Sequence, residues 1–272
     1  MKLLYALLAI GLCCASLASQ AQTPNNPVEP GIRAAQRGDY SAARQSWLPL
    51  ADKGNTDAQN NLGVMYERGW GVPRDAAKAV EYYTLAATKG NAAAQNNLGV
   101  AFEKGAGMPA RDIAQAAQWY AKAATGGDLN AQNNLGVLYE RGDGVPKDLA
   151  AALRWYGAAA AKNHASAQNN VGVMLERGNG VPADAVKAAA WYRKAADQNN
   201  APAQNNLGVL YGTGKGVKED MVTANFWFTL AARVGSINGA TNRDATNRKL
   251  NDSQRAEVAQ MLVRWQNRNV KP

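Results

Sequence analysis

The feature that most constrains this chain is a tetrapeptide that returns at a nearly fixed interval. Ala-Gln-Asn-Asn begins at five positions that lie 36 or 37 residues apart, namely Ala58, Ala94, Ala131, Ala167 and Ala203. A period of this length is typical of solenoids, in which each unit buries its apolar face only by stacking on its neighbours. The one extra residue falls in the segment 107–112, and an insertion confined to a turn is what a solenoid tolerates.

Each repeat divides into two predicted helices. In the first copy, one helix runs from about Thr56 to Arg68 and ends at a Gly-x-Gly-Val-Pro turn, because glycine permits a positive φ and proline cannot continue a helix. Asp75 then stands at the N-cap of a second helix, which ends near Gly90. The other copies repeat this aspartate at Asp112, Asp148, Asp184 and Asp220. The sequence therefore predicts an all-α fold, a solenoid of αα-hairpins.

Helical periodicity sorts the faces of the two helices. The predicted core stripe of the first copy consists of Ala58, Leu62, Met65 and Tyr66 on one helix and Ala79, Tyr83, Ala86 and Ala87 on the other. Gly63 lies on a flank, where the missing side chain lets a neighbouring helix approach closely. Four second helices carry a tryptophan one position before the core aromatic residue, and we expect these tryptophans to pack between units: Trp119, Trp155, Trp191 and Trp227.

The repeated positions also carry a family resemblance. The pattern A-x-x-x-L-G-x-x-Y-x-x-G-x-G-V-x-x-D-x-x-x-A-x-x-W-Y-x-x-A-A resembles the Sel1-like repeat, a relative of the tetratricopeptide repeat, and the third copy fits it from Ala131 to Ala160. The match covers roughly residues 55–235. The resemblance implies a right-handed superhelix whose concave wall is made of the first helices. It also implies a non-catalytic scaffold that binds a protein or an extended peptide.

The first 21 residues have the features of a secretory signal peptide. A single Lys2 precedes an apolar run from Leu3 to about Leu12, and the segment ends in small residues at Ala21. The run is too short for a stable membrane span. We therefore expect export, to the periplasm in a Gram-negative source or otherwise by secretion. Cys13 and Cys14 both lie in this leader, so the mature chain would hold no disulfide and no thiol nucleophile.

The rest of the chain is organised around the repeats. Residues 22–30 hold three prolines and are predicted to be a linker, and residues 31–54 resemble the truncated repeat that often opens such proteins. Five repeats are expected over 55–90, 91–127, 128–163, 164–199 and 200–235. Residues 236–272 leave the repeat and are predicted to form capping helices. There Asn251 and Gln254 can form a capping box, ahead of an apolar face of Val258, Met261, Leu262 and Trp265.

The candidate binding residues lie opposite the predicted core of the first helices. All five copies carry Asn-Asn, and a valine follows the first of the two by four residues. Asparagine costs roughly 0.6 kcal/mol relative to alanine inside a helix, so its repetition indicates a function or a set of buried hydrogen bonds. The candidate partner-binding residues are Asn60, Val64, Glu67, Asn96, Val100, Asn133, Val137, Asn169, Val173, Asn205 and Val209.

The two asparagines of each pair have different expected roles. A carboxamide offers donors and an acceptor, and related tetratricopeptide domains hold a peptide backbone with such groups. We expect the first asparagine of each pair to point away from the core and to form this surface. The second is expected in the seam between units, where it satisfies loop backbone groups: Asn61, Asn97, Asn134, Asn170 and Asn206. Recent duplication of one unit is a third explanation for the pairs.

The sequence argues against most classes of enzymes and of metal-dependent proteins. His164 is the sole histidine, so a histidine-based metal cluster or triad is excluded. The segment 212–216 resembles a phosphate loop, but no strand precedes it and no serine or threonine follows Lys215. We therefore expect no catalytic residue, no metal and no cofactor, and we expect no nucleic acid among the partners.

Two alternative functions remain open at this point. Some exported, cysteine-rich relatives are credited with binding or hydrolysing β-lactams, although this chain departs from them in its cysteine content. The second alternative is an envelope-binding module. The net charge is +9, and residues 233–272 hold eight basic residues against three acidic ones. This basic cap could contact peptidoglycan or another anionic surface.

Overall fold

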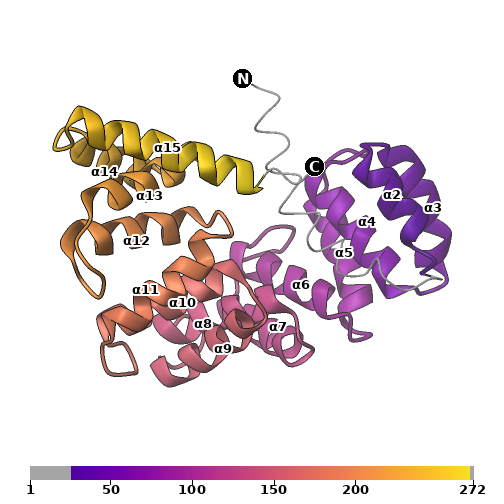
Figure 1. The fold of residues 1–272 in the computed structure, drawn as a ribbon. Helices are drawn as coiled ribbons and strands as arrows, with labels where there is room; N and C mark the ends of the chain where they lie inside the picture. The colour runs from indigo at the N-terminus through magenta and orange to yellow at the C-terminus, as the bar shows by residue number, and fades with distance from the viewer. Residues whose placement is uncertain (1–25, 270–272) are drawn as a thin grey trace. The chain divides into compact units, whose positions relative to one another are not determined.

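The computed structural model describes residues 26–269, which form fourteen helices and no strand (Figure 1). The predicted signal peptide and both cysteines lie outside these residues. Among the described helices, none combines the length and the apolar character that crossing a membrane requires. The prediction of an all-α fold is confirmed.

The described residues divide into two compact units. The first comprises residues 26–138 and 142–146, and the second comprises residues 139–141 and 147–269. Within each unit, helices that follow one another in the chain pack against one another. Each unit is therefore a stack of helical hairpins, as the repeat predicts.

The helices of the first unit are α2 (Glu29–Gln36), α3 (Tyr40–Asp52), α4 (Thr56–Arg68), α5 (Ala76–Ala87), α6 (Ala92–Lys104), α7 (Ile113–Thr125) and most of α8 (Leu129–Arg141). Those of the second are α9 (Leu149–Ala161), α10 (Ala165–Arg177), α11 (Ala185–Ala196), α12 (Ala201–Thr213), α13 (Met221–Arg233), α14 (Ile237–Asn247) and α15 (Asp252–Asn269). We name α4, α6, α8, α10 and α12 the A helices, and α5, α7, α9, α11 and α13 the B helices.

The N-terminal boundary differs from the prediction. Helix α2 begins at Glu29, inside the segment 22–30 that was expected to be a linker. Pro30 lies in the first turn of this helix, where its missing N–H group would have had no helical partner. With α3, this helix forms the short hairpin that the segment 31–54 predicts.

The ends of the helices follow the local signals of the sequence. All five predicted N-cap aspartates accept a backbone hydrogen bond at the start of a B helix, with distances of 2.8–3.0 Å. Each A helix ends at a glycine with positive φ, such as Gly69 at 71°. The second turn glycine packs on the preceding repeat, since a Cβ at Gly144 would lie 2.6 Å from the backbone of Ile113. The turn therefore both ends one helix and spaces two repeats.

The predicted core of the first copy is buried, including Leu62, Met65 and Tyr83. A Cβ added at Gly63 would lie 2.6 Å from the ring of Tyr83, so this glycine sets how closely α4 and α5 approach. Two of the four tryptophans pack between repeats as predicted: Trp119 packs against the core cluster of the preceding hairpin, and the fully buried Trp227 belongs to the cluster that includes Tyr192 of the preceding hairpin. Packing of the half-buried Trp155 and Trp191 between units stays a prediction. The core prediction is confirmed.

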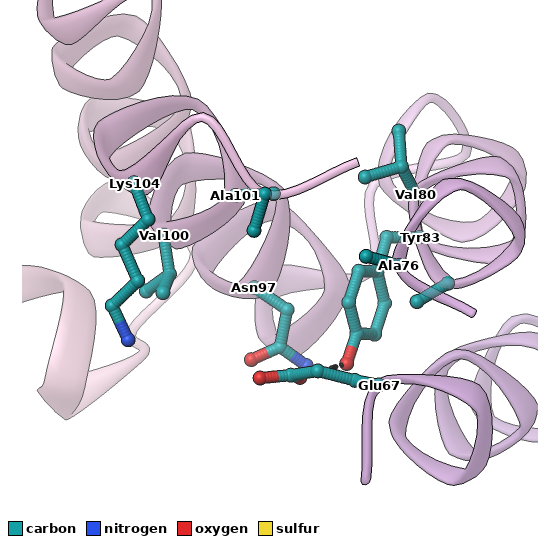
Figure 2. Close-up of a pocket in the computed structure, with 10 residues that line it drawn as sticks. Glu67, Ala76, Val80, Tyr83, Asn97, Val100, Ala101 and Lys104 are labelled. Atoms are coloured by element: carbon teal, nitrogen blue, oxygen red, sulfur yellow. Dashed lines mark hydrogen bonds between the residues drawn. The ribbon is translucent and has the colours of Figure 1, made fainter. Parts of the chain in front are cut away.

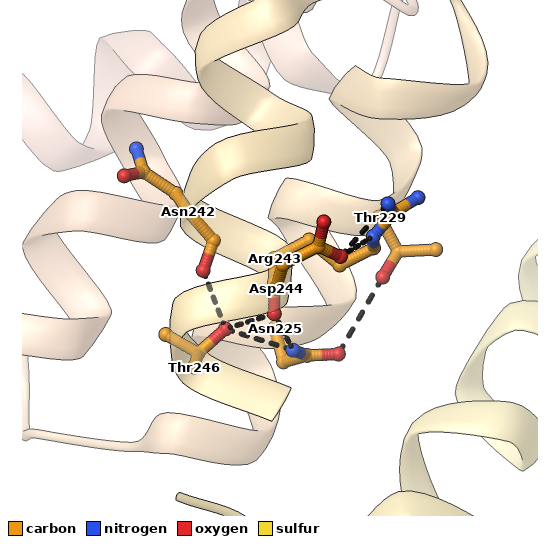
Figure 3. A network of polar contacts seen from close by, with 6 residues as sticks. All are labelled: Asn225, Thr229, Asn242, Arg243, Asp244 and Thr246. Atoms are coloured by element: carbon orange, nitrogen blue, oxygen red, sulfur yellow. Dashed lines mark hydrogen bonds and ion pairs between the residues drawn. The ribbon is translucent and has the colours of Figure 1, made fainter. Parts of the chain in front are cut away.

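The C-terminal helices close the second unit. Asn251 and Gln254 form the predicted capping box, with both reciprocal hydrogen bonds at 2.9 Å. Trp265 of α15 packs edge-on against Trp227, with ring centroids 5.3 Å apart. Helix α14 is held on α13 by the Asn225 amide, which donates to the Arg243 carbonyl and the Thr246 hydroxyl (Figure 3).

Helix α14 differs from the expectation that the chain leaves the repeat at Ser236. Ser236 caps α14 as Asn200 caps α12, 36 residues earlier. Asn242 then takes the place of the second asparagine of a pair and donates to Asn205. Residues 236–247 therefore continue the row of A helices, although the Ala-Gln-Asn-Asn string is absent.

Candidate functional site

The glutamine of each Ala-Gln-Asn-Asn string ties an A helix to the helix before it. Its Nε2 atom donates to a backbone carbonyl in the last turn of the preceding helix, and the side chain is buried. The five bonds are Gln59–Ala51, Gln95–Ala87, Gln132–Ala124, Gln168–Ala160 and Gln204–Ala196, at 3.0–3.3 Å. Each of these carbonyls also accepts the backbone N–H of the residue three positions later, in the turn after the helix, so the glutamine adds a second hydrogen bond. Sequence reasoning missed this role, although the invariance of the glutamine among the copies was a signal for it.

The asparagines form a second link between neighbouring A helices. The Nδ2 atom of the second asparagine in one copy donates to the Oδ1 atom of the first asparagine in the copy before. The bonds are Asn97–Asn60 (2.9 Å), Asn134–Asn96 (3.2 Å) and Asn206–Asn169 (3.1 Å), and Asn242 extends the series to Asn205 (2.9 Å). Within each unit, the pairs therefore form a ladder of amide hydrogen bonds that holds neighbouring repeats in register.

This geometry corrects the expected orientation of the first asparagine. Asn60, Asn96 and Asn169 are at most 9% exposed, so they do not point freely away from the core. Each is covered because the A helix of the next repeat lies against it. The second asparagine occupies the seam as expected, but at Asn97, Asn134 and Asn206 it pairs with a side chain and not with loop backbone. A contribution of Asn133 and Asn205, which are half-buried, to partner binding stays a prediction.

A buried tyrosine fixes the carboxylate near the end of each of four A helices. The tyrosine hydroxyl of the B helix donates to glutamate Oε2 in the pairs Tyr83–Glu67, Tyr120–Glu103, Tyr156–Glu140 and Tyr192–Glu176, at 2.6–2.8 Å. Burial, and then the hydrogen bond to Glu103, raises the pKa of Tyr120 far above its ordinary value, so the hydroxyl stays a donor. The fifth copy replaces both members, with Gly212 and Phe228. This joint loss indicates that the two residues act as a pair.

The predicted valines are the apolar groups that remain accessible beside these carboxylates. Val64, Val100, Val137 and Val173 are half-buried, and Val209 is 37% exposed. Within each unit, we call the surface formed by its share of these five valines and of the four paired glutamates the A face. Exposed basic side chains adjoin the glutamates at Arg68, Lys104, Arg141 and Arg177. The A face thus combines apolar contact area, carboxylates held by tyrosines, and exposed cations.

A small hollow opens on the A face between the first two repeats (Figure 2). Glu67 and Tyr83 line it from one repeat, and Asn97, Val100 and Lys104 line it from the next. Its volume of about 30 Å³ suffices for one or two water molecules. The hollow exists because the second copy carries Ala101 where the other copies have a larger residue: Met65, Leu138, Met174 and Leu210.

The described residues contain no group of three histidine, cysteine, aspartate or glutamate side chains that could hold a metal ion. His164 is the N-cap of α10, where its Nδ1 atom accepts a hydrogen bond from the Ala167 N–H at 3.2 Å. Burial lowers the pKa of His164, which favours the neutral ring that this bond requires. Its position therefore assigns the histidine a capping role.

Comparison with protein families gives a match along most of the folded part. A family model described as Sel1 repeat matches residues 56–91, 92–128, 129–164, 165–200 and 201–236. In a rat protein, DAP3-binding cell death enhancer 1 from Rattus norvegicus, 50 residues are 44% identical to this chain. That match covers 18% of this chain and 10% of the rat protein, so it extends to one short segment of the relative.

Two solved structures are similar over much longer stretches. One is c5321, a protective antigen present in uropathogenic Escherichia coli strains that displays an SLR fold. It is 36% identical with a TM-score of 0.78, and the match covers 84% of this chain and 49% of that one. The chain thus spans about half the length of c5321. The other is a Sel1 repeat protein from Oxalobacter formigenes, 32% identical with a TM-score of 0.73, in which 79% of this chain and 86% of that chain are covered.

Proposed function

Because the chain belongs to the Sel1 repeat family, we propose that it is an exported, non-catalytic scaffold that binds a protein or an extended peptide through its A face. Sel1 repeats form scaffolds that typically serve protein–protein interaction, and their folds are generally non-catalytic. The family match specifies neither which surface of this chain binds the partner nor whether the chain is exported. Each of these two proposals therefore has its own support and its own test.

The observation that carries the proposal is the composition of the A face. Valine side chains alternate there with carboxylates that buried tyrosines hold in place, as in Glu103 beside Val100. A fixed carboxylate loses little side-chain entropy when a partner binds, so its hydrogen bonds contribute more net affinity. Arg68 and Lys104 at the rim add exposed charges of the opposite sign. This surface suits a polypeptide, which offers apolar, charged and amide groups at short intervals.

Affinity capture tests the choice of surface. Val100→Asp and Val209→Asp place a charge on the A face, whereas Leu85→Asp and Val186→Asp place the same charge at exposed apolar positions on B helices. We expect the wild type and the two B-helix variants to retain the same partner from envelope extract, and the A-face variants to lose it. Equal retention by all four variants contradicts the proposed surface. Replacing the first asparagines would be less informative, because it also breaks the ladder between repeats.

Export rests on the leader-like composition of residues 1–21. We expect the protein recovered from the periplasm or the culture medium to begin at or close to Gln22. N-terminal sequencing of the protein from its native compartment checks this, and a cytoplasmic protein that begins at Met1 overturns the proposal of export.

The basic C-terminal cap favours a second candidate function, binding to an anionic envelope surface. Exposed Arg248 and Lys249 follow α14, and Arg264 is exposed on α15. Electrostatic binding of this kind weakens as salt concentration rises. Co-sedimentation with peptidoglycan or with anionic vesicles separates the two functions. A variant with Arg248, Lys249 and Arg264 replaced by serine should then lose pelleting while it keeps the captured partner.

A further inference from the structure

In the second unit, Glu176 holds the position that corresponds to Glu67, and a lysine of the protein itself pairs with it. Lys215 lies between the two glycines of the turn after α12, and its Nζ atom is 3.2 Å from Glu176 Oε1. The other oxygen of Glu176 accepts the hydroxyl hydrogen bond of Tyr192. At Glu176, a carboxylate that a tyrosine holds in place therefore accepts the ammonium group of a lysine from the next repeat.

The first unit has the same carboxylate without the lysine. The residue between the two turn glycines after α6 is Ala106, and it lines the hollow together with Glu67. Tyr83 donates to Glu67 Oε2, and within residues 26–269 no donor lies within hydrogen-bond distance of Oε1. No ion pair in this part of the chain joins Lys104 to Glu67, and Figure 2 shows their charged groups apart. Tyr83 thus holds the Glu67 carboxylate in position through Oε2, and Oε1 can accept a further hydrogen bond or ion pair.

A second difference between the copies enlarges the hollow beside Glu67. Position 101 is alanine, whereas the fifth copy has the larger, fully buried Leu210. Compared with the repeat that carries Lys215, the second repeat therefore lacks the turn lysine and has less apolar bulk at position 101. Its Lys104 lines the hollow without pairing with Glu67. Val80, Val100 and Ala101 form apolar walls there, next to the charge of Glu67.

We propose that this hollow receives a basic side chain, lysine or arginine, of the bound polypeptide. The proposal rests on the proposed function and adds the chemistry of the partner. The cationic group pairs with Glu67 Oε1 as Lys215 pairs with Glu176 Oε1. The methylene groups lie across the open side of the hollow against Val80, Val100 and Ala101, as the stems of long basic side chains do on apolar surface. A bond between ionised groups at a held carboxylate is shorter and stronger than a neutral one.

Two small probes test the site directly. We would titrate the purified protein with Nα-acetyl-lysine amide and with the uncharged Nα-acetyl-norleucine amide, and follow the NMR signals of Ala101, Ala106 and the Tyr83 ring. The lysine probe should produce saturable shifts and the norleucine probe should not. Equal binding of both probes, or no saturable shift with the lysine probe, overturns the proposal.

Four variants separate the site from general charge effects. Ala106→Lys supplies the internal lysine of the fifth copy, and Glu67→Gln keeps an acceptor for Tyr83 while it removes the charge. Each should weaken the lysine probe about fivefold or more. Ala110→Lys adds the same charge in the same turn, away from the residues that line the hollow, and should leave the affinity unchanged. Lys104→Ala removes a like charge and should strengthen binding, so a loss of affinity in this variant contradicts the geometry.

Capture of the partner distinguishes the failure of this inference from the failure of the proposed function. Suppose that the wild type captures a partner through the A face and that Ala106→Lys captures it equally well. The inference that a basic side chain of the partner enters the hollow is then wrong, and the proposed scaffold function is unaffected. If the wild type captures nothing while the lysine probe binds at Glu67, the scaffold function fails and the site remains.

Discussion

Breaking one bond of the asparagine ladder should destabilise the first unit, although asparagine is a poor residue for a helix interior. In the variant Asn97→Ala, the Oδ1 atom of Asn60 loses its donor while the side chain of Asn60 remains buried. An unsatisfied buried acceptor costs about 1–3 kcal/mol. The alanine returns about 0.6 kcal/mol of helix propensity. The cost of the unsatisfied carbonyl exceeds this gain, so we expect the free energy of unfolding to fall by about 0.5–2.5 kcal/mol.

The first copy provides a matched control. Asn61 occupies the same position as Asn97, but among the described residues neither of its amide atoms has a hydrogen-bond partner, and the side chain is 1% exposed. Asn61→Ala therefore removes two buried polar groups that gain nothing from the fold. We expect this variant to be neutral or more stable than the wild type, which is the opposite sign from Asn97→Ala.

The assay should report local stability, because a repeat array need not unfold in one step. Hydrogen exchange at the amides of α4 and α6 gives the free energy of opening for this part of the chain. In a double-mutant cycle of Asn60→Ala and Asn97→Ala, the two residues should couple by about 0.5–1.5 kcal/mol. Coupling indistinguishable from zero, together with higher stability of Asn97→Ala, would refute the role assigned to the ladder.

Three further predictions concern stability. Gly63→Ala should lower the free energy of unfolding by about 1–3 kcal/mol, because its Cβ would lie 2.6 Å from the Tyr83 ring. Gly157→Ala has open space around its Cβ and should raise the free energy of unfolding by up to about 1 kcal/mol. Thermal unfolding compares the two variants. Tyr120→Phe should cost about 1.5–3 kcal/mol by urea unfolding, since it removes the donor to the Glu103 carboxylate. Burial lowers the pKa of His164, so only the unfolded chain takes up its proton near pH 6.5; the contribution of His164 to stability should be complete above that pH and decline below it. In pH-dependent unfolding, His164→Asn should lack this decline, and an identical decline in both proteins contradicts the assignment.

The fold could be predicted from the sequence because its signals are local. The turn glycines, the aspartate N-caps and the core stripe each act within one hairpin, and the period shows that hairpins stack. Gly63 could be assigned to a close helix contact for the same reason. The start of α2 was harder to predict from the sequence. Three prolines indicate a linker, while Pro30 is also acceptable in the first turn of a helix.

The candidate site was less predictable because it depends on contacts between repeats. A helical wheel places Asn60 opposite the core of its own helix, but it cannot show that the next A helix covers this side. The same limit hid the glutamine bonds and the tyrosine–glutamate pairs, whose members come from different helices. Capping helices were predicted over residues 236–272, but α14 was not recognised as a further A helix, because it keeps only one asparagine of the repeated string.

Site-specific photo-crosslinking in living cells tests most directly the claim that a polypeptide binds the A face. A photoreactive benzoylphenylalanine would replace Val209 on the A face, and in a matched variant it would replace Val186, which is more exposed and lies on a B helix. If a polypeptide binds the A face, we expect a discrete protein adduct from position 209 and none from position 186. Adducts of the same protein from both positions, or from position 186 alone, would contradict it.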